Sequence, residues 1–424
     1  MAERQYICID LKSFYASVEC VERKLDPMTA KLVVADPTRS DKTICLAVSP
    51  AMKKLGVPGR ARVFQIPPGI EYITAPPRMA LYMEYSARIY GIYLKYISKD
   101  DIHVYSVDEA FMDVTDYLKL YNVTAKELGL RIMDDIYNTL GIRATCGIGT
   151  NLYLTKIALD IMAKRRPDFV GELDEESYKK ELWDHKPLTD FWMVGAGTVR
   201  TLEKYGIRTM RQIAEVNEDF LYGLFGVNAE LLIDHAWGRE PVKISDIKNY
   251  KTHSKSLTSG QVLSRDYNFT DARLIVKEMA DLLCLDLVDQ KLITNSVTLV
   301  VGFNNQEHRP MIRGTAALPL ETNADIVIIP EILKVYDEIV EPSMMIRRVY
   351  LTCNRVKPEE YKQYSFFTDM EQLEKDRKMQ EAVISLKKKF GKNAVLKGMN
   401  LQEAGTTRER NRQIGGHRAG EINE

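Results

Sequence analysis

A strand-like stretch with two adjacent carboxylates restricts the fold of this chain more than any other segment. Residues 104–114 are mostly apolar, β-branched or aromatic, but Asp108 and Glu109 interrupt them. A strand that packs against a core does not hold two acids at its centre unless a cation lies beside them. Neighbouring strand residues point to opposite faces, so both acids reach one site only through a turn or bulge. The plain alternative is a hairpin turn with two solvated acids.

A third acid follows another strand-like run near the N-terminus. Residues 6–9 are apolar, Asp10 ends the run, and a helical pattern of apolar residues begins at Phe14. Oxygen ligands suit Mg²⁺, and two ions about 3.5–4 Å apart can activate a hydroxyl and stabilise a leaving pyrophosphate. We therefore predict that Asp10, Asp108 and Glu109 are catalytic residues and ligands of two Mg²⁺ ions.

Three ordered segments resemble the motifs of the Y-family (translesion) DNA polymerases, in the UmuC-like branch of Gram-positive bacteria. They are Asp10 with residues 13–19, residues 106–110, and residues 144–164. The resemblance covers about residues 5–370 and implies an α+β multidomain fold, the right-hand polymerase. Its expected parts are a palm (1–25 and 78–167), small fingers (26–77), a thumb with a helix–hairpin–helix (168–240), a linker (241–248), a little finger (249–357) and a flexible tail (358–424).

The resemblance assigns two aromatic residues and one lysine to the incoming nucleotide. Phe14 and Tyr15 lie in the first motif, and the ring of Tyr15 would exclude a ribose 2′-hydroxyl. Core packing is the alternative for Tyr15. Lys53 stands where the family usually has an arginine that contacts the triphosphate, and a lysine keeps the charge but loses bidentate geometry. Many members have a tyrosine where this chain has Pro50.

A second lysine closes the third motif. Lys164 would neutralise charge on the β- and γ-phosphates as the bond to the α-phosphate breaks. The usual family spacing is lengthened here by one residue, at residues 161–163. Lys156 therefore competes for the same role.

Contacts to primer–template DNA are expected from the thumb and the little finger. Gly195 and Gly197 open a short helix in a pattern that resembles a helix–hairpin–helix, where backbone amides bind phosphate. A plain helix–turn–helix connection is the alternative. The little finger is expected to alternate strand, helix, strand, strand, helix, strand. Its candidate supporting charges are Lys255, Arg265, Arg347 and Arg355.

The segment after the little finger resembles a peptide that binds the sliding clamp. Gln363, Phe366 and Phe367 would be its anchors in a pocket of the clamp. A recombinase filament or an accessory subunit is a further expected partner. One helix is predicted over residues 370–390, and disorder with a binding role beyond it.

Composition excludes several other classes of protein. The chain has 59 basic and 59 acidic residues, and its six cysteines are scattered without paired spacing. Reduced thiols, no signal-like segment and no apolar run of about 20 residues predict a cytoplasmic protein without a membrane partner. The resemblance implies that this protein is nucleoid-associated.

The sequence thus predicts a DNA-templated DNA polymerase that acts in damage tolerance, the SOS response and mutagenesis, the biological roles following from the family alone. Two rival functions stay open. One is a non-catalytic DNA-damage scaffold of the same fold that recruits other polymerases to the clamp. The other is a nucleotide cyclase, which the helix–hairpin–helix and the clamp-like peptide disfavour.

Overall fold

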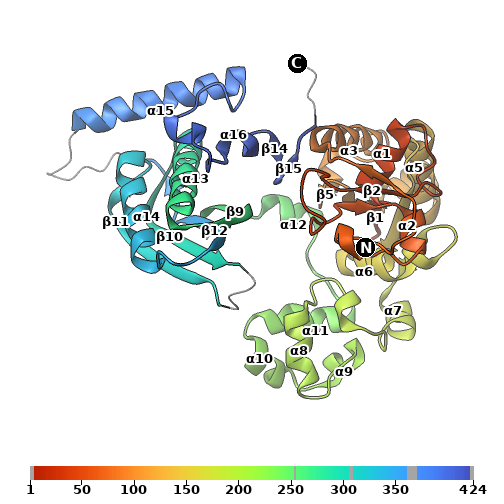
Figure 1. The fold of residues 1–424 in the computed structure, drawn as a ribbon. Helices are drawn as coiled ribbons and strands as arrows, with labels where there is room; N and C mark the ends of the chain where they lie inside the picture. The colour runs from red at the N-terminus through yellow and green to blue at the C-terminus, as the bar shows by residue number, and fades with distance from the viewer. Residues whose placement is uncertain (1–3, 253–254, 305–308, 361–369, 421–424) are drawn as a thin grey trace. The chain divides into compact units, whose positions relative to one another are not determined.

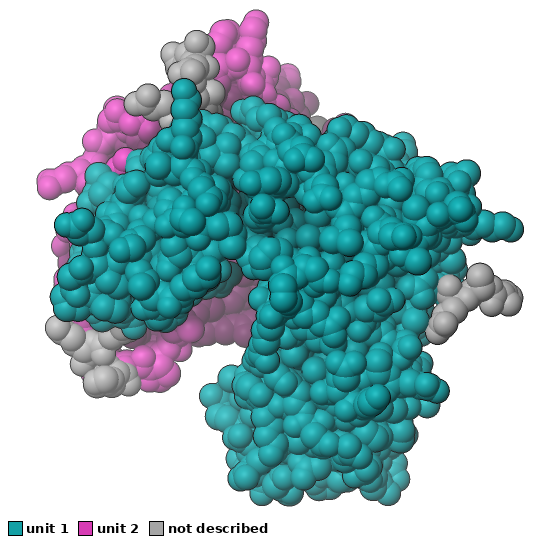
Figure 2. All heavy atoms as spheres, turned by 90° about the vertical axis from the view of Figure 1, so that its right-hand side faces the viewer, with its two compact units in different colours: residues 1–250, 420–424 teal, residues 251–419 magenta. Residues whose placement is uncertain are grey.

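The computed structural model describes residues 4–252, 255–304, 309–360 and 370–420. They form two compact units (Figure 1 and Figure 2). Unit 1 extends to Tyr250 and includes Gly420, and unit 2 is Lys251–Ala419. Among the described residues, no helix has both the length and the apolar character needed to cross a membrane.

A five-stranded sheet forms the centre of unit 1. Its order is β5 (Ile102–Val104), β6 (Glu109–Asp113), β1 (Tyr6–Leu11), β7 (Ala144–Gly149) and β8 (Val170–Leu173). β1 is antiparallel to both neighbours, and only β7 and β8 pair in parallel. Because α3 (Met79–Tyr93) and α5 (Ala125–Leu140) cover one face and α6 (Leu152–Ile157) the other, β1 is apolar on both sides (Figure 1).

Local signals in the sequence set the ends of the principal helices. The hydroxyl of Thr124 accepts a hydrogen bond from the Glu127 amide in a capping box. Gly141 ends α5 in the left-handed conformation, with a φ of 69°. Ser49 likewise caps α2 (Pro50–Lys54), in which Pro50 occupies the first turn. The other helices of this region are α1 (Phe14–Glu22) and α4 (Thr115–Tyr121).

The expected fingers have a small sheet and core of their own. Their sheet has the order β3 (Ala47–Val48), β2 (Leu32–Val34) and β4 (Ile73–Ala75). The expected thumb is helical and contains α7 (Glu175–Glu181), α8 (Ala196–Glu203), α9 (Met210–Glu215), α10 (Glu218–Phe225) and α11 (Asn228–Trp237). Its core is continuous with residues of α6.

A helix replaces most of the predicted linker over residues 241–248. α12 (Ile244–Asn249) packs near β5, and Ile244 is 3% exposed beside Tyr6 and Phe111. Ile247 lies three residues further on and contacts the same cluster. The prediction of a linker is wrong here because these two residues form an apolar side that the palm buries.

Unit 2 has the predicted order of strands and helices. Its sheet runs β11 (Ile312–Thr322), β10 (Leu292–Phe303), β12 (Ile346–Asn354) and β9 (Leu257–Tyr267), and β13 (Lys357–Pro358) pairs with β10. α13 (Phe269–Asp289) and α14 (Asp325–Ile339) cover one face of this sheet (Figure 1). The other face carries neither helix of this pair, and we call it the helix-free face.

The described part of the predicted flexible tail is folded. It contains α15 (Met370–Phe390), a 3₁₀ turn at Gly398–Leu401, α16 (Thr407–Arg410) and a hairpin of β14 (Gln413–Ile414) and β15 (His417–Arg418). Ala404 joins the core of unit 2, and Glu278 of α13, 1% exposed, accepts hydrogen bonds from this segment. The prediction of disorder is wrong because these residues cover buried acids of α13. The clamp-like peptide, residues 363–367, lies outside the described residues.

Candidate active site

A tight hairpin turn brings the three predicted carboxylates to one end of the central sheet. The amides of Tyr105 and Ser106 both donate to the Glu109 carbonyl, at 3.0 and 3.1 Å, so β5 turns back into β6 just before Glu109. Asp10 lies opposite Glu109 in the register of β1 and β6. The Leu11 amide donates to the Asp108 carbonyl at 3.0 Å. The predicted turn is confirmed, and it places Asp108 beside the Asp10–Glu109 pair.

Two lysines and a fourth acid alternate with these carboxylates. Lys156 Nζ lies 2.6 Å from Glu109 Oε1 and 2.9 Å from Asp160 Oδ2. Lys164 Nζ lies 2.7 Å from Asp160 Oδ1 and 3.2 Å from Asp10 Oδ2. The acids of this strand end therefore have the cationic neighbours that their position demands.

A π-helical turn positions the second lysine. Residues Ala158–Met162 form this turn, in which the Ala163 amide donates to the Ala158 carbonyl five residues earlier. Such a turn holds one residue more than an α-turn. It thus accommodates the lengthened spacing of the third motif and leaves Lys164 within reach of Asp10.

Glycines allow this turn to lie directly on the sheet. A Cβ on Gly147 would come within 2.2 Å of the Thr155 carbonyl oxygen, and one on Gly171 within 2.3 Å of the Ala158 carbonyl oxygen. The backbone of α6 and of the π-turn therefore touches β7 and β8 without an intervening side chain.

Burial and neighbouring charges shift the pKa values of Asp10 and Lys164. Burial raises the pKa of Asp10 to about 6, with Lys164 opposing the shift and Asp108 adding to it. Burial alone would lower the pKa of Lys164, but Asp10 and Asp160 raise it above its usual value. The side chain of Lys164 is 44% exposed and that of Lys156 only 8%, so Lys164 is the lysine that a ligand can reach.

The donor set fits Mg²⁺, although the side chains are turned toward the lysines. Among the described residues, no three His, Cys, Asp or Glu side chains converge as a metal cluster. The reason is that Lys156 and Lys164 hold Glu109 and Asp10. Three carboxylates at one strand end, with the raised pKa of Asp10, supply hard oxygen ligands and the negative charge that divalent ions neutralise.

Comparison with known proteins identifies the family. The model of the impB/mucB/samB family matches residues 9–160, and the model of that family's C-terminal domain matches residues 254–366, together more than half of the chain. A "Putative UV-damage repair protein UvrX" of Bacillus subtilis is 27% identical over 419 residues, covering 98% of both chains. "DNA polymerase IV 2" of the same species is also 27% identical, covering 98% of this chain and 99% of its own length.

A solved Y-family DNA polymerase chimera has the same fold. It superposes with a TM-score of 0.64 at 21% identity and covers 84% of this chain and 99% of its own. The chain belongs to the Y family of DNA polymerases. The predicted right-hand fold and the predicted class of enzyme, a DNA-directed DNA polymerase, are confirmed with it.

The two aromatic residues of the first Y-family motif have different surroundings. Tyr15 is half-buried and stacks on Tyr82, with ring centroids 4.5 Å apart and planes at 16°. Tyr82 donates to Glu19, a buried carboxylate that Arg78 also binds at 2.8 and 2.9 Å. Phe14 is 2% exposed, so a nucleotide can reach little of its ring, and core packing accounts for its position.

The predicted lysine of the fingers faces the same end of the sheet. Loss of hydration lowers the pKa of Lys53, while Asp10 and Asp108 act on it in the opposite direction. Lys12 approaches the ring of Phe169, with its Nζ 4.2 Å from the centroid, and burial lowers the pKa of Lys12 too. Pro50 only supports the first turn of α2.

The predicted DNA contacts of the thumb lie on its surface. Gly195 is the N-cap of α8, and Gly197 lies in its first turn. Both are exposed, and a Cβ at either position would meet nothing within 4 Å. Packing inside the thumb therefore does not explain these glycines.

The predicted basic residues of the little finger have unequal access to a ligand. Lys255 and Arg355 are exposed. Arg347 pairs with Asp266 at 3.5 Å, and Arg265 lies 3.8 Å from Asp271 and over the Tyr267 ring. The next residue, Arg348, lies opposite Val262 and Gly302 on the helix-free face of the sheet.

The helix-free face also bears a row of hydroxyl groups. Four threonines lie side by side across all four strands, and they are Thr258, Thr352, Thr298 and Thr315. Thr258 and Thr352 are hydrogen-bonded at 3.0 Å, and Thr298 and Thr315 at 2.9 Å.

Sequence reasoning also missed Asp160 and the Glu19–Tyr82 pair. The spacing Lys156, Asp160, Lys164 has two intervals of four residues, which on a helix predicts neighbouring charges. Glu19 and Tyr82 are 63 residues apart, and no local pattern links them.

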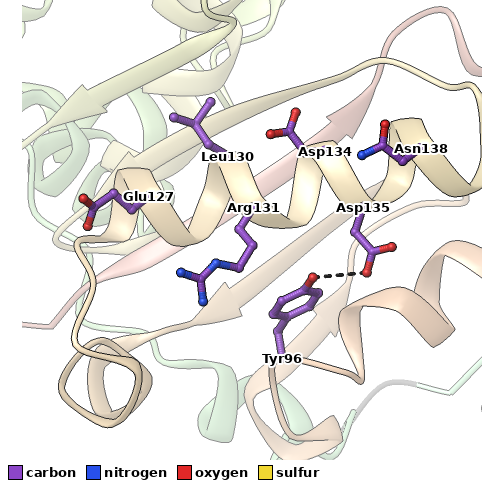
Figure 3. Close-up of a pocket in the computed structure, with 7 residues that line it drawn as sticks. All are labelled: Tyr96, Glu127, Leu130, Arg131, Asp134, Asp135 and Asn138. Atoms are coloured by element: carbon purple, nitrogen blue, oxygen red, sulfur yellow. Dashed lines mark hydrogen bonds between the residues drawn. The ribbon is translucent and has the colours of Figure 1, made fainter.

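A surface hollow of about 580 Å³ lies elsewhere in unit 1, along α5 (Figure 3). Its lining is Tyr96, Glu127, Leu130, Arg131, Asp134, Asp135 and Asn138. Tyr96 donates to Asp135 across it at 3.1 Å. None of the predicted site residues lines this hollow.

Proposed function

We propose that this chain adds dNTPs to a primer 3′-hydroxyl by two-metal-ion chemistry at Asp10, Asp108 and Glu109, in translesion DNA synthesis. The observation that supports this most directly is the register of Asp10 against Glu109, with Asp108 in the adjoining turn. Lys164 supports it further, because its side chain is 44% exposed and can exchange a carboxylate partner for phosphate.

The ions would be held by the three carboxylates, where they lower the pKa of the primer hydroxyl and stabilise charge at the α-phosphorus. Glu109 must then turn away from Lys156, and Asp10 from Lys164. Asp160 binds both lysines, so neither loses its last carboxylate. Lys164 is left to meet the β- and γ-phosphates, with Lys53 from the fingers.

The Tyr15 ring would close the site beneath the sugar. Its stacking on Tyr82 limits how far it can move aside, and Glu19 fixes Tyr82 in turn. A ring held in this way leaves no room for a 2′-hydroxyl and offers it no hydrogen bond.

Primer–template DNA would contact the thumb near Gly195 and Gly197 and the helix-free face of the little finger. The threonine row and Arg348 offer neutral donors and one cation, which suit sugar–phosphate contacts without sequence readout. Recruitment by a sliding clamp through Gln363, Phe366 and Phe367 is proposed from the resemblance of that peptide alone.

Extension of a recessed primer with Mg²⁺ and one dNTP at a time tests the chemistry. Glu109→Gln should lower templated incorporation at least about 100-fold, since it removes one charge from the metal ligands. Asp113→Asn is the matched control, because Asp113 lies at the other end of β6 and pairs with Arg4. Activity that survives Glu109→Gln would place the metals elsewhere. DNA binding without incorporation in the wild type would favour the scaffold.

A further inference from the structure

The C-terminal segment concentrates positive charge in a chain that is neutral as a whole. Residues 387–420 contain nine Lys or Arg and two Glu, whereas the full chain has 59 of each charge. We call this stretch the basic segment. The catalytic site does not account for this charge. The sequence predicted only that the residues beyond 390 are disordered and bind a partner.

Buried acids of unit 2 anchor the basic segment. Glu278 accepts from Asn400 Nδ2 and from the Thr406 amide, both at 2.8 Å. Lys397 Nζ lies 2.5 Å from Asp281 and 3.0 Å from Asp325, each of which is 6% exposed. The segment is therefore held in one conformation before any partner binds, which reduces the entropy lost on binding.

Further contacts fix the segment along the outer strand of the sheet. Arg410 donates to the Gln261 side chain at 3.0 Å and to the Gly260 carbonyl at 3.4 Å. Both residues belong to β9, the strand that also carries Thr258 of the threonine row. Arg410 and Lys397 are thus used internally.

Other basic side chains of the segment point to solvent. Lys389, Lys392, Arg408 and Arg412 are all exposed. Asn411 donates to the Lys392 carbonyl at 3.2 Å, and Asn393 donates to the Arg408 carbonyl at 3.1 Å, so these two loops are tied together. Lys392 and Arg408 are consequently held close together, and we call the four cations the basic cluster.

We propose that the basic cluster binds the phosphate backbone of duplex DNA, as a contact additional to those of the thumb and the little-finger sheet. Exposed Lys and Arg side chains bind the phosphates of the backbone through their charge, without reading bases. The adjacent hairpin turns through Gly415 and Gly416, with φ of 59° and 80°, so no side chain at its tip obstructs a close backbone approach.

This inference rests on the proposed function only in taking DNA as the ligand. When one chain contacts DNA at several sites, an additional weak contact raises the overall affinity, because the other contacts keep the DNA at a high effective concentration. The cluster would hold the enzyme on the duplex and leave the chemical step unchanged.

The test measures binding of the full-length chain to a labelled primer–template duplex by fluorescence anisotropy, without Mg²⁺ or dNTP, over a series of salt concentrations. Arg408→Gln with Arg412→Gln is the test variant. Lys119→Gln with Lys334→Gln is the control, because it removes the same charge from exposed positions outside the segment. Each lost phosphate contact should lower the salt slope by about 0.9.

The test variant should therefore show a slope lower by about 1.8 and roughly tenfold weaker binding at moderate salt, while the control stays near the wild type. Incorporation at saturating DNA should be unchanged in both variants. Equal slopes and affinities in all three proteins would overturn the proposal, and a basic segment that serves an acidic protein would give that result. A wild type that binds no DNA would instead refute the proposed function.

Discussion

Substitution of Gly147 by alanine tests whether the positions of Lys156 and Lys164 depend on direct backbone contact between helix and sheet. The new Cβ would lie 2.2 Å from the Thr155 carbonyl oxygen, 2.6 Å from the Leu159 amide nitrogen and 2.7 Å from Leu159 Cβ. Ordinary contacts begin near 3.4 Å. Two of the three neighbours are backbone atoms, so no rotamer change relieves the clash, and α6 with the π-turn must move from β7 by about 1 Å.

Overpacking of this kind costs about 3 kcal/mol in the free energy of unfolding. The displacement also moves Lys156 and Lys164 relative to the carboxylates, and a misplacement of about 1 Å lowers catalysis by about 100-fold. Incorporation assayed at a temperature well below the unfolding transition measures the loss of catalysis separately from the loss of stability.

Tryptophan fluorescence in urea measures the stability of unit 1 selectively. All three tryptophans, Trp183, Trp192 and Trp237, belong to this unit. Gly91→Ala is the matched control, since Gly91 lies in α3 and a Cβ added there would meet nothing within 4 Å. It should stabilise the protein by about 0.5–1 kcal/mol. A Gly147→Ala protein within about 0.5 kcal/mol of the wild type would refute the close-packing argument.

Two further predictions concern buried acids. The pKa of Asp10 is raised to about 6, so the folded, metal-free protein binds its proton more readily than the unfolded chain, and stability falls as pH rises from about 4 to 6. Asp10→Asn should remove this fall and raise the free energy of unfolding at pH 8 by about 1–3 kcal/mol. Urea unfolding in the presence of a chelator measures this change. Equal stability of the wild type at pH 4 and pH 8 would contradict the prediction. Lys397→Met leaves Asp281 and Asp325 without their shared cation and should destabilise unit 2 by about 3 kcal/mol, seen as faster amide exchange in α13. Lys378→Met, an exposed change on α15, is its control.

Local signals in the sequence were enough to predict much of the fold. The acids within an apolar run predicted the turn at Asp108, and the apolar run that ends at Asp10 predicted β1. These features depend on residues a few positions apart. For the same reason the order of elements in unit 2 was correct to within a few residues.

Features that depend on distant partners were not predictable. Glu278 lies on α13 in a sequence that reads as an ordinary amphipathic helix, and its partners follow more than 120 residues later. Because these partners lie in the tail, no local pattern in the sequence indicated that the tail folds against α13. Arg347 and Arg348 are adjacent at a bulge, and only the strand pairing shows that Arg348 lies opposite Val262 on the helix-free face.

The charges at the strand end are unbalanced in favour of the carboxylates. Asp10, Asp108, Glu109 and Asp160 bring four carboxylates, against the two cations Lys156 and Lys164. Burial is the main cause of the raised pKa of Asp10; Asp108 and Glu109 add to the shift, and Lys164 opposes it. Divalent ions would reverse the sign of this charge, and a triphosphate is a ligand that a reversed site attracts. Asp160 contacts both lysines, so in the proposed mechanism it would remain paired with them while Asp10 and Glu109 turn toward the ions.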